Sequence, residues 1–64
     1  MDRIDICKEH FREVSQQALK DNCKRSIVSV ENVRVVTIPY SGRKYVQVKH
    51  LLTGELEHYI LVKK

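Results

Sequence analysis

The last twenty residues, Tyr45–Lys64, read YVQVKHLLTGELEHYILVKK and decide the fold. Apolar and polar side chains alternate on both sides of Thr53-Gly54, which is typical of two strands joined by a turn. A three-residue turn would place eight alternating residues on one face, because successive side chains of a strand point to opposite faces. These residues are Val46, Val48, His50, Leu52, Leu56, His58, Ile60 and Val62. This face is the expected core face of a hairpin.

The opposite face of this hairpin mixes aromatic, cationic and apolar side chains. Its members are Tyr45, Gln47, Lys49, Leu51, Glu57, Tyr59, Leu61 and Lys63. Such a mixture is not ordinary solvent-exposed surface, and the sequence therefore predicts that this outer face of the sheet contacts a ligand or a partner.

Upstream of the hairpin, the apolar periodicity changes from helical to extended. Ile4, Cys7, Phe11, Val14 and Ala18 recur at steps of three and four, which predicts an amphipathic helix over about residues 3–22 with Asp2 as its N-cap and Cys7 in the core. After Asn22, β-branched residues predict strands within 26–30, 33–39, 44–52 and 56–63. Glu31-Asn32 is either a turn between two strands or a bulge within one long strand.

The predicted fold class is therefore α+β, with an N-terminal amphipathic helix packed on a three- or four-stranded antiparallel meander sheet. At 64 residues, we expect one small domain over residues 1–64. No apolar run approaches the roughly 20 residues that a membrane span needs, and the N-terminus lacks the order of a signal peptide. We expect a cytoplasmic protein with no membrane partner.

The net charge of +4 is unevenly distributed along the chain. Residues 1–32 hold six basic and six acidic residues, whereas residues 33–64 hold six basic residues and two acidic ones. A basic sheet attracts polyanions, and nucleic acid is the usual one. A modest positive charge that only keeps a small domain soluble is the competing interpretation.

Catalytic and metal-binding patterns are weak in this sequence. The serines have no spacing to a histidine that would make a nucleophile and base, and Gly42 and Gly54 are isolated turn glycines. Cys7 and Cys23 are 16 residues apart, which is roughly 24 Å along a straight helix and too far for a disulfide or a shared zinc ion. We expect no enzyme, no catalytic residues, no metal site and no cofactor.

Two hypotheses remain for the outer sheet face. In the first, a small regulatory or accessory protein binds DNA or RNA by stacking bases on aromatic rings while cations hold phosphate. The residues predicted for this site are Arg43, Lys44, Tyr45, Lys49, Tyr59 and Lys63. In the alternative, the face joins two protein chains, as a homodimer or as a small inhibitor bound to a larger protein. The residues predicted for that interface are Tyr45, Leu51, Tyr59 and Leu61.

Overall fold

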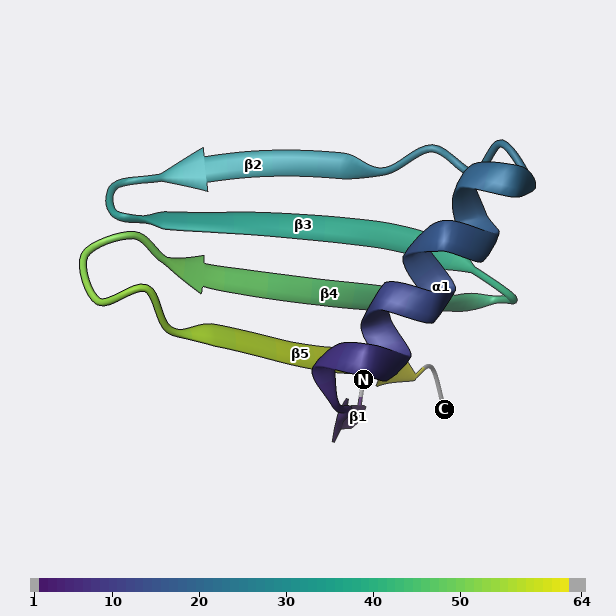
Figure 1. Cartoon of the computed structure of the whole chain (residues 1–64), viewed down its shortest axis with the longest axis horizontal. Coiled ribbons are helices and arrows are strands. Elements are labelled where there is room, and N and C mark those ends of the chain that lie inside the picture. Colours follow the sequence, from purple (N-terminus) through teal and green to yellow (C-terminus); the bar gives the residue numbers. More distant parts are fainter. Residues whose placement is uncertain (1, 63–64) are drawn as a thin grey trace.

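The computed structural model describes residues 2–62, which form one helix and five strands. In chain order these are β1 (Asp2–Asp5), α1 (Lys8–Lys20), β2 (Ser26–Val30), β3 (Val33–Tyr40), β4 (Arg43–His50) and β5 (Leu56–Val62). The strands form one antiparallel sheet in the order β1-β5-β4-β3-β2, and α1 lies on one face of it (Figure 1). The α+β class and the N-terminal helix are confirmed, but the sheet has five strands rather than three or four.

The first residues form a strand, so the predicted helix over residues 3–22 is wrong in its first turns. Asp2–Asp5 pairs antiparallel with β5, with Ile4 opposite Ile60, and the Ile6 N–H donates to the His58 carbonyl at 3.0 Å. Ile4 fits the helical spacing of the apolar stripe, but it fits a strand equally well. A single apolar residue at the end of a pattern cannot distinguish the periodicity of a helix from that of a strand. Pairing with β5 provides the hydrogen bonds that decide between them.

Both ends of α1 are capped by side-chain or backbone groups. Cys7, and not Asp2, is the N-cap, and its Sγ accepts from the His10 N–H at 3.4 Å. At the other end Asn22 has a φ of 57°, and the Cys23 N–H donates to the Ala18 carbonyl at 2.9 Å. This is the Schellman arrangement that ends many helices. Cys7 is therefore exposed, contrary to the predicted core position, and Cys23 packs against the core.

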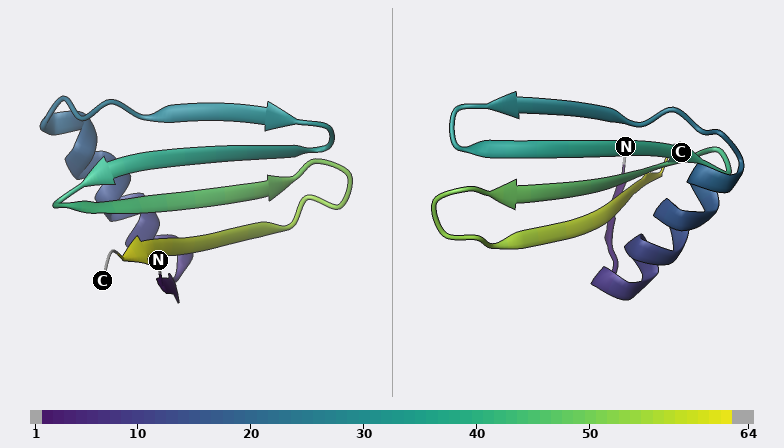
Figure 2. Two further views of the ribbon diagram at one scale, coloured as in Figure 1. Left: turned by 180° about the vertical axis from the view of Figure 1, so that it is seen from behind. Right: turned by 45° about the horizontal axis from the view of Figure 1, so that its top comes forward.

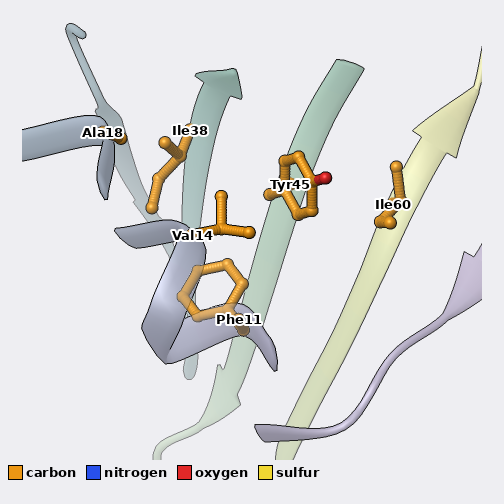
Figure 3. Packing of buried hydrophobic residues seen from close by; sticks show 6 residues of the cluster. All are labelled: Phe11, Val14, Ala18, Ile38, Tyr45 and Ile60. Carbon is orange, nitrogen blue, oxygen red and sulfur yellow. The ribbon is translucent and has the colours of Figure 1, made fainter. Parts of the chain in front are cut away.

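The core lies between α1 and the middle strands of the sheet. Phe11, Val14 and Ala18 point from α1 towards the sheet, as their spacing predicts (Figure 3). They meet one buried residue from each of β3, β4 and β5, namely Ile38, Tyr45 and Ile60. These three are direct neighbours in the strand register, so they form one apolar row beneath the helix. We call the sheet face that carries this row the helix side, and the opposite face the open face.

The register of β4 with β5 differs from the predicted one by an odd number of positions. Lys49 lies opposite Leu56, and five residues, 51–55, connect the strands in place of a three-residue turn. Hydrogen bonds from the Gly54 N–H to the His50 carbonyl (2.7 Å) and from the His50 N–H to the Glu55 carbonyl (2.9 Å) close this loop. When the register shifts by an odd number of residues, the side chains of one strand move to the opposite face of the sheet relative to its partner strand. Tyr45 therefore shares the helix side with Ile60, and Val46 shares the open face with Tyr59.

The two tyrosines provide a test of this register. Tyr45 is 4% exposed beneath α1, so Tyr45→Ala should lower the free energy of unfolding by about 3–5 kcal/mol, as truncation of a buried aromatic does. Tyr59→Ala removes a half-buried ring from the open face and should cost less than half as much. Urea denaturation of both variants measures the difference. An equal or larger loss for Tyr59→Ala would contradict the observed register.

Candidate nucleic-acid interface

A basic groove runs between α1 and the helix side of the sheet. It has a volume of about 390 Å³, and Lys8 and Arg12 line it from the helix while Arg25 lines it from the approach to β2. Its other lining residues are Phe11, Ser15, Gln16, Ile27, Val36, Ile38, Gln47 and His58. Among these lining residues there are three cations and no carboxylate. A concave surface lined by positive charges concentrates negatively charged ligands.

The helical repeat explains why this side of α1 is basic. Lys8 and Arg12 are four residues apart, and Ser15 lies three residues further on, so all three share one side of the helix. Glu9 and Glu13 follow the cations by one residue, which turns them about 100° away from that side. The acidic residues of α1 are therefore absent from the groove lining.

The strands project beyond α1 and extend the basic surface. The β2–β3 turn and the β4–β5 loop lie at the end of the sheet that the helix does not reach (Figure 1; Figure 2, right). Arg34 and Lys49 lie opposite each other in the register there, on the same face as Val36 and Gln47. Both are exposed. The helix side thus carries two further cations in line with the groove.

The opposite end of the sheet is also basic. A hollow of about 370 Å³ there is lined by Lys24, Arg25, Ser26, Thr37, Pro39 and Lys44. A neighbouring hollow of about 460 Å³ lies at the β3–β4 turn and includes Lys44, Arg43 and Leu61. Arg25 lines both the groove and the first hollow, and Lys44 lines both hollows. The shared residues therefore connect the groove with the two hollows, and the basic track from Lys8 to Arg43 crosses from the helix side to the open face at Lys44.

The structure divides the residues predicted for nucleic-acid binding among several surfaces. Arg43 and Lys44 lie at the end of the basic track, and Lys49 extends the groove at the far end. Tyr45 is buried under α1, where its ring centroid is 6.0 Å from that of His10, so it is not on an outer face. Tyr59 lies on the open face, and Lys63 is outside the described residues.

The open face is mainly apolar, although Lys44 shares it with Pro39 and Leu61 at the β3–β4 turn. It carries side chains from all five strands, and α1 covers none of it (Figure 2, left). Its apolar members are Val28, Val30, Val33, Val35, Val46, Val48, Tyr59 and Leu61. Of the residues predicted for a protein interface, Tyr59 and Leu61 belong to it. Tyr45 is buried on the other side, and Leu51 lies exposed in the β4–β5 loop.

One ionic cluster interrupts the open face at its β1 edge. The Arg3 Nε lies 3.0 Å from the Asp5 Oδ1, and its Nη2 lies 3.2 Å from the Glu57 Oε1. The guanidinium also stacks over the Tyr59 ring at 4.2 Å from the centroid. His50 Nε2 contacts the second Glu57 oxygen at 2.9 Å, and these hydrogen bonds from His50 and Arg3 lower the pKa of Glu57. The ring of Tyr59 is thus already in contact with Arg3 of the same chain.

His58 lies in the groove and is held as a neutral imidazole. The Gln47 amide nitrogen lies 3.0 Å from the His58 Nε2; because the amide nitrogen is a donor, the ring nitrogen accepts. Desolvation by burial lowers the pKa of His58, and the nearby charge of Lys8 lowers it further, while Glu9 acts in the opposite direction. His58 therefore adds a hydrogen-bonding group to the groove without adding charge at neutral pH.

Sequence reasoning missed the central cations of this site. The positions of Lys24 and Arg25 after the helical pattern suit either the negative end of the helix dipole or an extended basic surface, and the sequence does not choose between the two. The spacing of Lys8 and Arg12 next to the apolar stripe was a usable signal, because it places both cations beside the buried face of α1. The groove itself could not be predicted from the sequence, because its shape depends on how α1 packs on the sheet.

Comparisons with protein-family models, curated proteins and solved structures found no match for this chain. Across residues 2–62, no helix is both long enough and apolar enough to cross a membrane. In the same range, no group of three or more His, Cys, Asp or Glu side chains is arranged to hold a metal ion.

The lowered pKa of His58 predicts a loss of stability in mild acid. The unfolded chain has the higher His58 pKa, near 6.5, and so takes up the proton first as the pH falls. The free energy of unfolding should therefore decrease as the pH falls through this value, and the effect should level off once the folded state is also protonated. Urea denaturation across this range should show a smaller decrease for His58→Gln. An NMR titration that gives His58 a pKa above 6.5 would contradict the assignment.

Proposed function

We propose that this protein is a small non-enzymatic regulatory or accessory protein that binds nucleic acid through the basic groove. The observation that carries the proposal is the set of three groove cations, Lys8, Arg12 and Arg25, with no carboxylate in the lining. Nucleic acid presents a row of phosphates, and neutralising them releases counterions and drives binding. A role on nucleic acid implies an intracellular location.

The extent of the basic surface supports a strand-like ligand over a small anion. Arg34 and Lys49 continue the groove at one end, and Lys24, Lys44 and Arg43 continue the track at the other. A lone phosphate needs one cluster of donors, whereas a polynucleotide backbone needs cations at repeated intervals. Gln16, Gln47 and His58 supply polar groups between the cations, which suits contacts to sugars and bases.

A second candidate function is supported by the open face. Five exposed or half-buried valines together with Tyr59 and Leu61 form an apolar surface around the buried Val46, and α1 lies on the other face of the sheet. A surface of this kind is typical of protein interfaces. The groove and this apolar surface lie on opposite faces of the sheet, and the basic track reaches the open face at Lys44, so the two functions are compatible but meet at the β3–β4 turn. Tyr59→Ala should weaken binding to a protein partner and leave nucleic-acid affinity unchanged.

The groove is tested by the salt dependence of nucleic-acid binding. The three groove cations alone predict that log K for duplex DNA falls with log salt at a slope of about −2.7, each further cation that contacts phosphate steepens it by about 0.9, and Arg12→Ala should make it shallower by about 0.9. Fluorescence anisotropy with labelled single- and double-stranded DNA and RNA measures both quantities and identifies the preferred ligand.

Two matched variants control this experiment. Lys20→Ala removes the same charge from α1 at an exposed position outside the groove lining and should change affinity much less than Arg12→Ala. Tyr59→Ala alters the open face and should leave affinity unchanged. Equal losses for Arg12→Ala and Lys20→Ala, a large loss for Tyr59→Ala, or no binding to any of the four ligands at low salt would each overturn the proposal.

A further inference from the structure

The outer edge of β2 is an unprotected sheet edge. β2 is the last strand in the sheet order, and within residues 2–62 no strand pairs with its outer side (Figure 1). All five residues, Ser-Ile-Val-Ser-Val, are exposed, with Ile27, Val28 and Val30 at 60%, 51% and 59%. The strand contains no charge and no proline, although proteins normally place such residues on edges to prevent pairing between chains.

The opposite edge of the sheet shows the protection that β2 lacks. β1 has only four residues, and three of them, Asp2, Arg3 and Asp5, are charged. A chain with one blocked edge and one free edge cannot add copies indefinitely by head-to-tail pairing. It can pair its free edge with the same edge of a second copy, and that contact closes after two chains.

The solvent-exposed area of the monomer is larger than that of a typical folded monomer of the same mass, which also favours a partner. The structure exposes 4924 Å² for a mass of 7.5 kDa. A folded monomer of this mass exposes about 4,200 Å², so this chain leaves an excess of about 700 Å². Each partner in a standard interface contributes about 800 Å², which is similar to the excess.

We propose that β2 pairs antiparallel with β2 of a second copy, about a two-fold axis at Val28. This register pairs Ser26 with Val30 of the second copy and Ile27 with Ser29 of the second copy, so it overlaps the whole of β2. The two sheets would become one continuous sheet of ten strands. This proposal does not depend on the proposed nucleic-acid function.

The hydrogen-bonding groups of β2 suit this register. Glu31 and Asn32 form the turn between β2 and β3, which makes Val30 and Val33 the closing pair of the hairpin. In such a hairpin the closing pair is hydrogen-bonded, and the bonding direction alternates along the strand. The N–H and C=O groups of Ile27 and Ser29 therefore point to the free edge. The two-fold axis at Val28 places them opposite each other.

Charge complementarity at both ends of β2 favours a second copy as the partner. Arg25 immediately precedes β2, and Glu31 immediately follows it. In the proposed register, Arg25 lies opposite Glu31 of the second copy, and the symmetry repeats this pair at the other end. A shift of the axis by one residue to either side would lose these two ion pairs and shorten the overlap. The uncharged strand is thus bracketed by opposite charges in self-complementary positions.

Oligomeric state tests the proposal directly. Sedimentation equilibrium of the wild-type chain up to about 1 mM should show a mass twice the 7.5 kDa of the monomer. Val28→Lys would place two ammonium groups opposite each other at the axis and should weaken the dimer at least about tenfold. Val28→Thr keeps a branched, uncharged side chain at the same position and should remain dimeric. Circular dichroism confirms that each variant is folded.

A charge exchange tests the register. Arg25→Glu and Glu31→Arg should each weaken the dimer roughly threefold or more, because each places like charges opposite one another at both ends. The double variant restores opposite charges and should recover the wild-type affinity. A monomeric wild type, a dimer that survives Val28→Lys, or a double variant no tighter than the single ones would overturn the proposal. A surviving dimer would assign the contact to the open face.

Discussion

A single thirteen-residue helix must cover a five-stranded sheet, and this mismatch in size determines the rest of the structure. At about 1.5 Å per residue, α1 is roughly 20 Å long and about 10 Å wide, whereas an eight-residue strand is about 26 Å long. The helix therefore packs against part of one face, over β3, β4 and β5. The parts of the sheet that α1 does not cover are the groove beside the helix, the open face and the two edges.

The same mismatch explains why the cations gather where they do. The part of the sheet next to the helix is left as a groove, and Lys8 and Arg12, which are both exposed, line it from α1. Arg25 reaches the same groove from the chain that leaves α1 for β2. The groove is thus a consequence of partial coverage, and its charge comes from the helical position of a few residues.

The sequence predicted the periodic parts of this fold and failed where two patterns fit equally well. Phe11, Val14 and Ala18 could be placed in the core, because apolar residues at this helical spacing form a stripe that packs against the rest of the protein. The β-branched runs gave four of the five strands. Ile4 fitted both a helix and a strand, and the deciding interaction was a pairing with β5, more than fifty residues away in the chain.

The β4–β5 register was wrong for a related reason. Tyr45 and Val46 are adjacent and both apolar, so either parity of the hairpin gives an apolar face. Local hydrophobicity cannot choose between them; loop 51–55 and the contact with α1 do. This error misplaced Tyr45 in both predicted sites. The strand half carries the charge excess, but the basic groove also uses Lys8 and Arg12 from the half in which acidic and basic residues balance.

The geometry of the proposed dimer connects the groove with the sheet edge. A two-fold axis between antiparallel strands is perpendicular to the sheet, so both helices lie on one side and both open faces on the other. Ile27 and Arg25 line the groove and also belong to the β2 edge or its approach. The two grooves therefore meet across the axis, where each Arg25 lies opposite Glu31 of the second copy, and Lys8 and Arg12 of both copies become available to one polynucleotide. Because each cation added along a single ligand releases further counterions, affinity would rise steeply with assembly without any new type of contact.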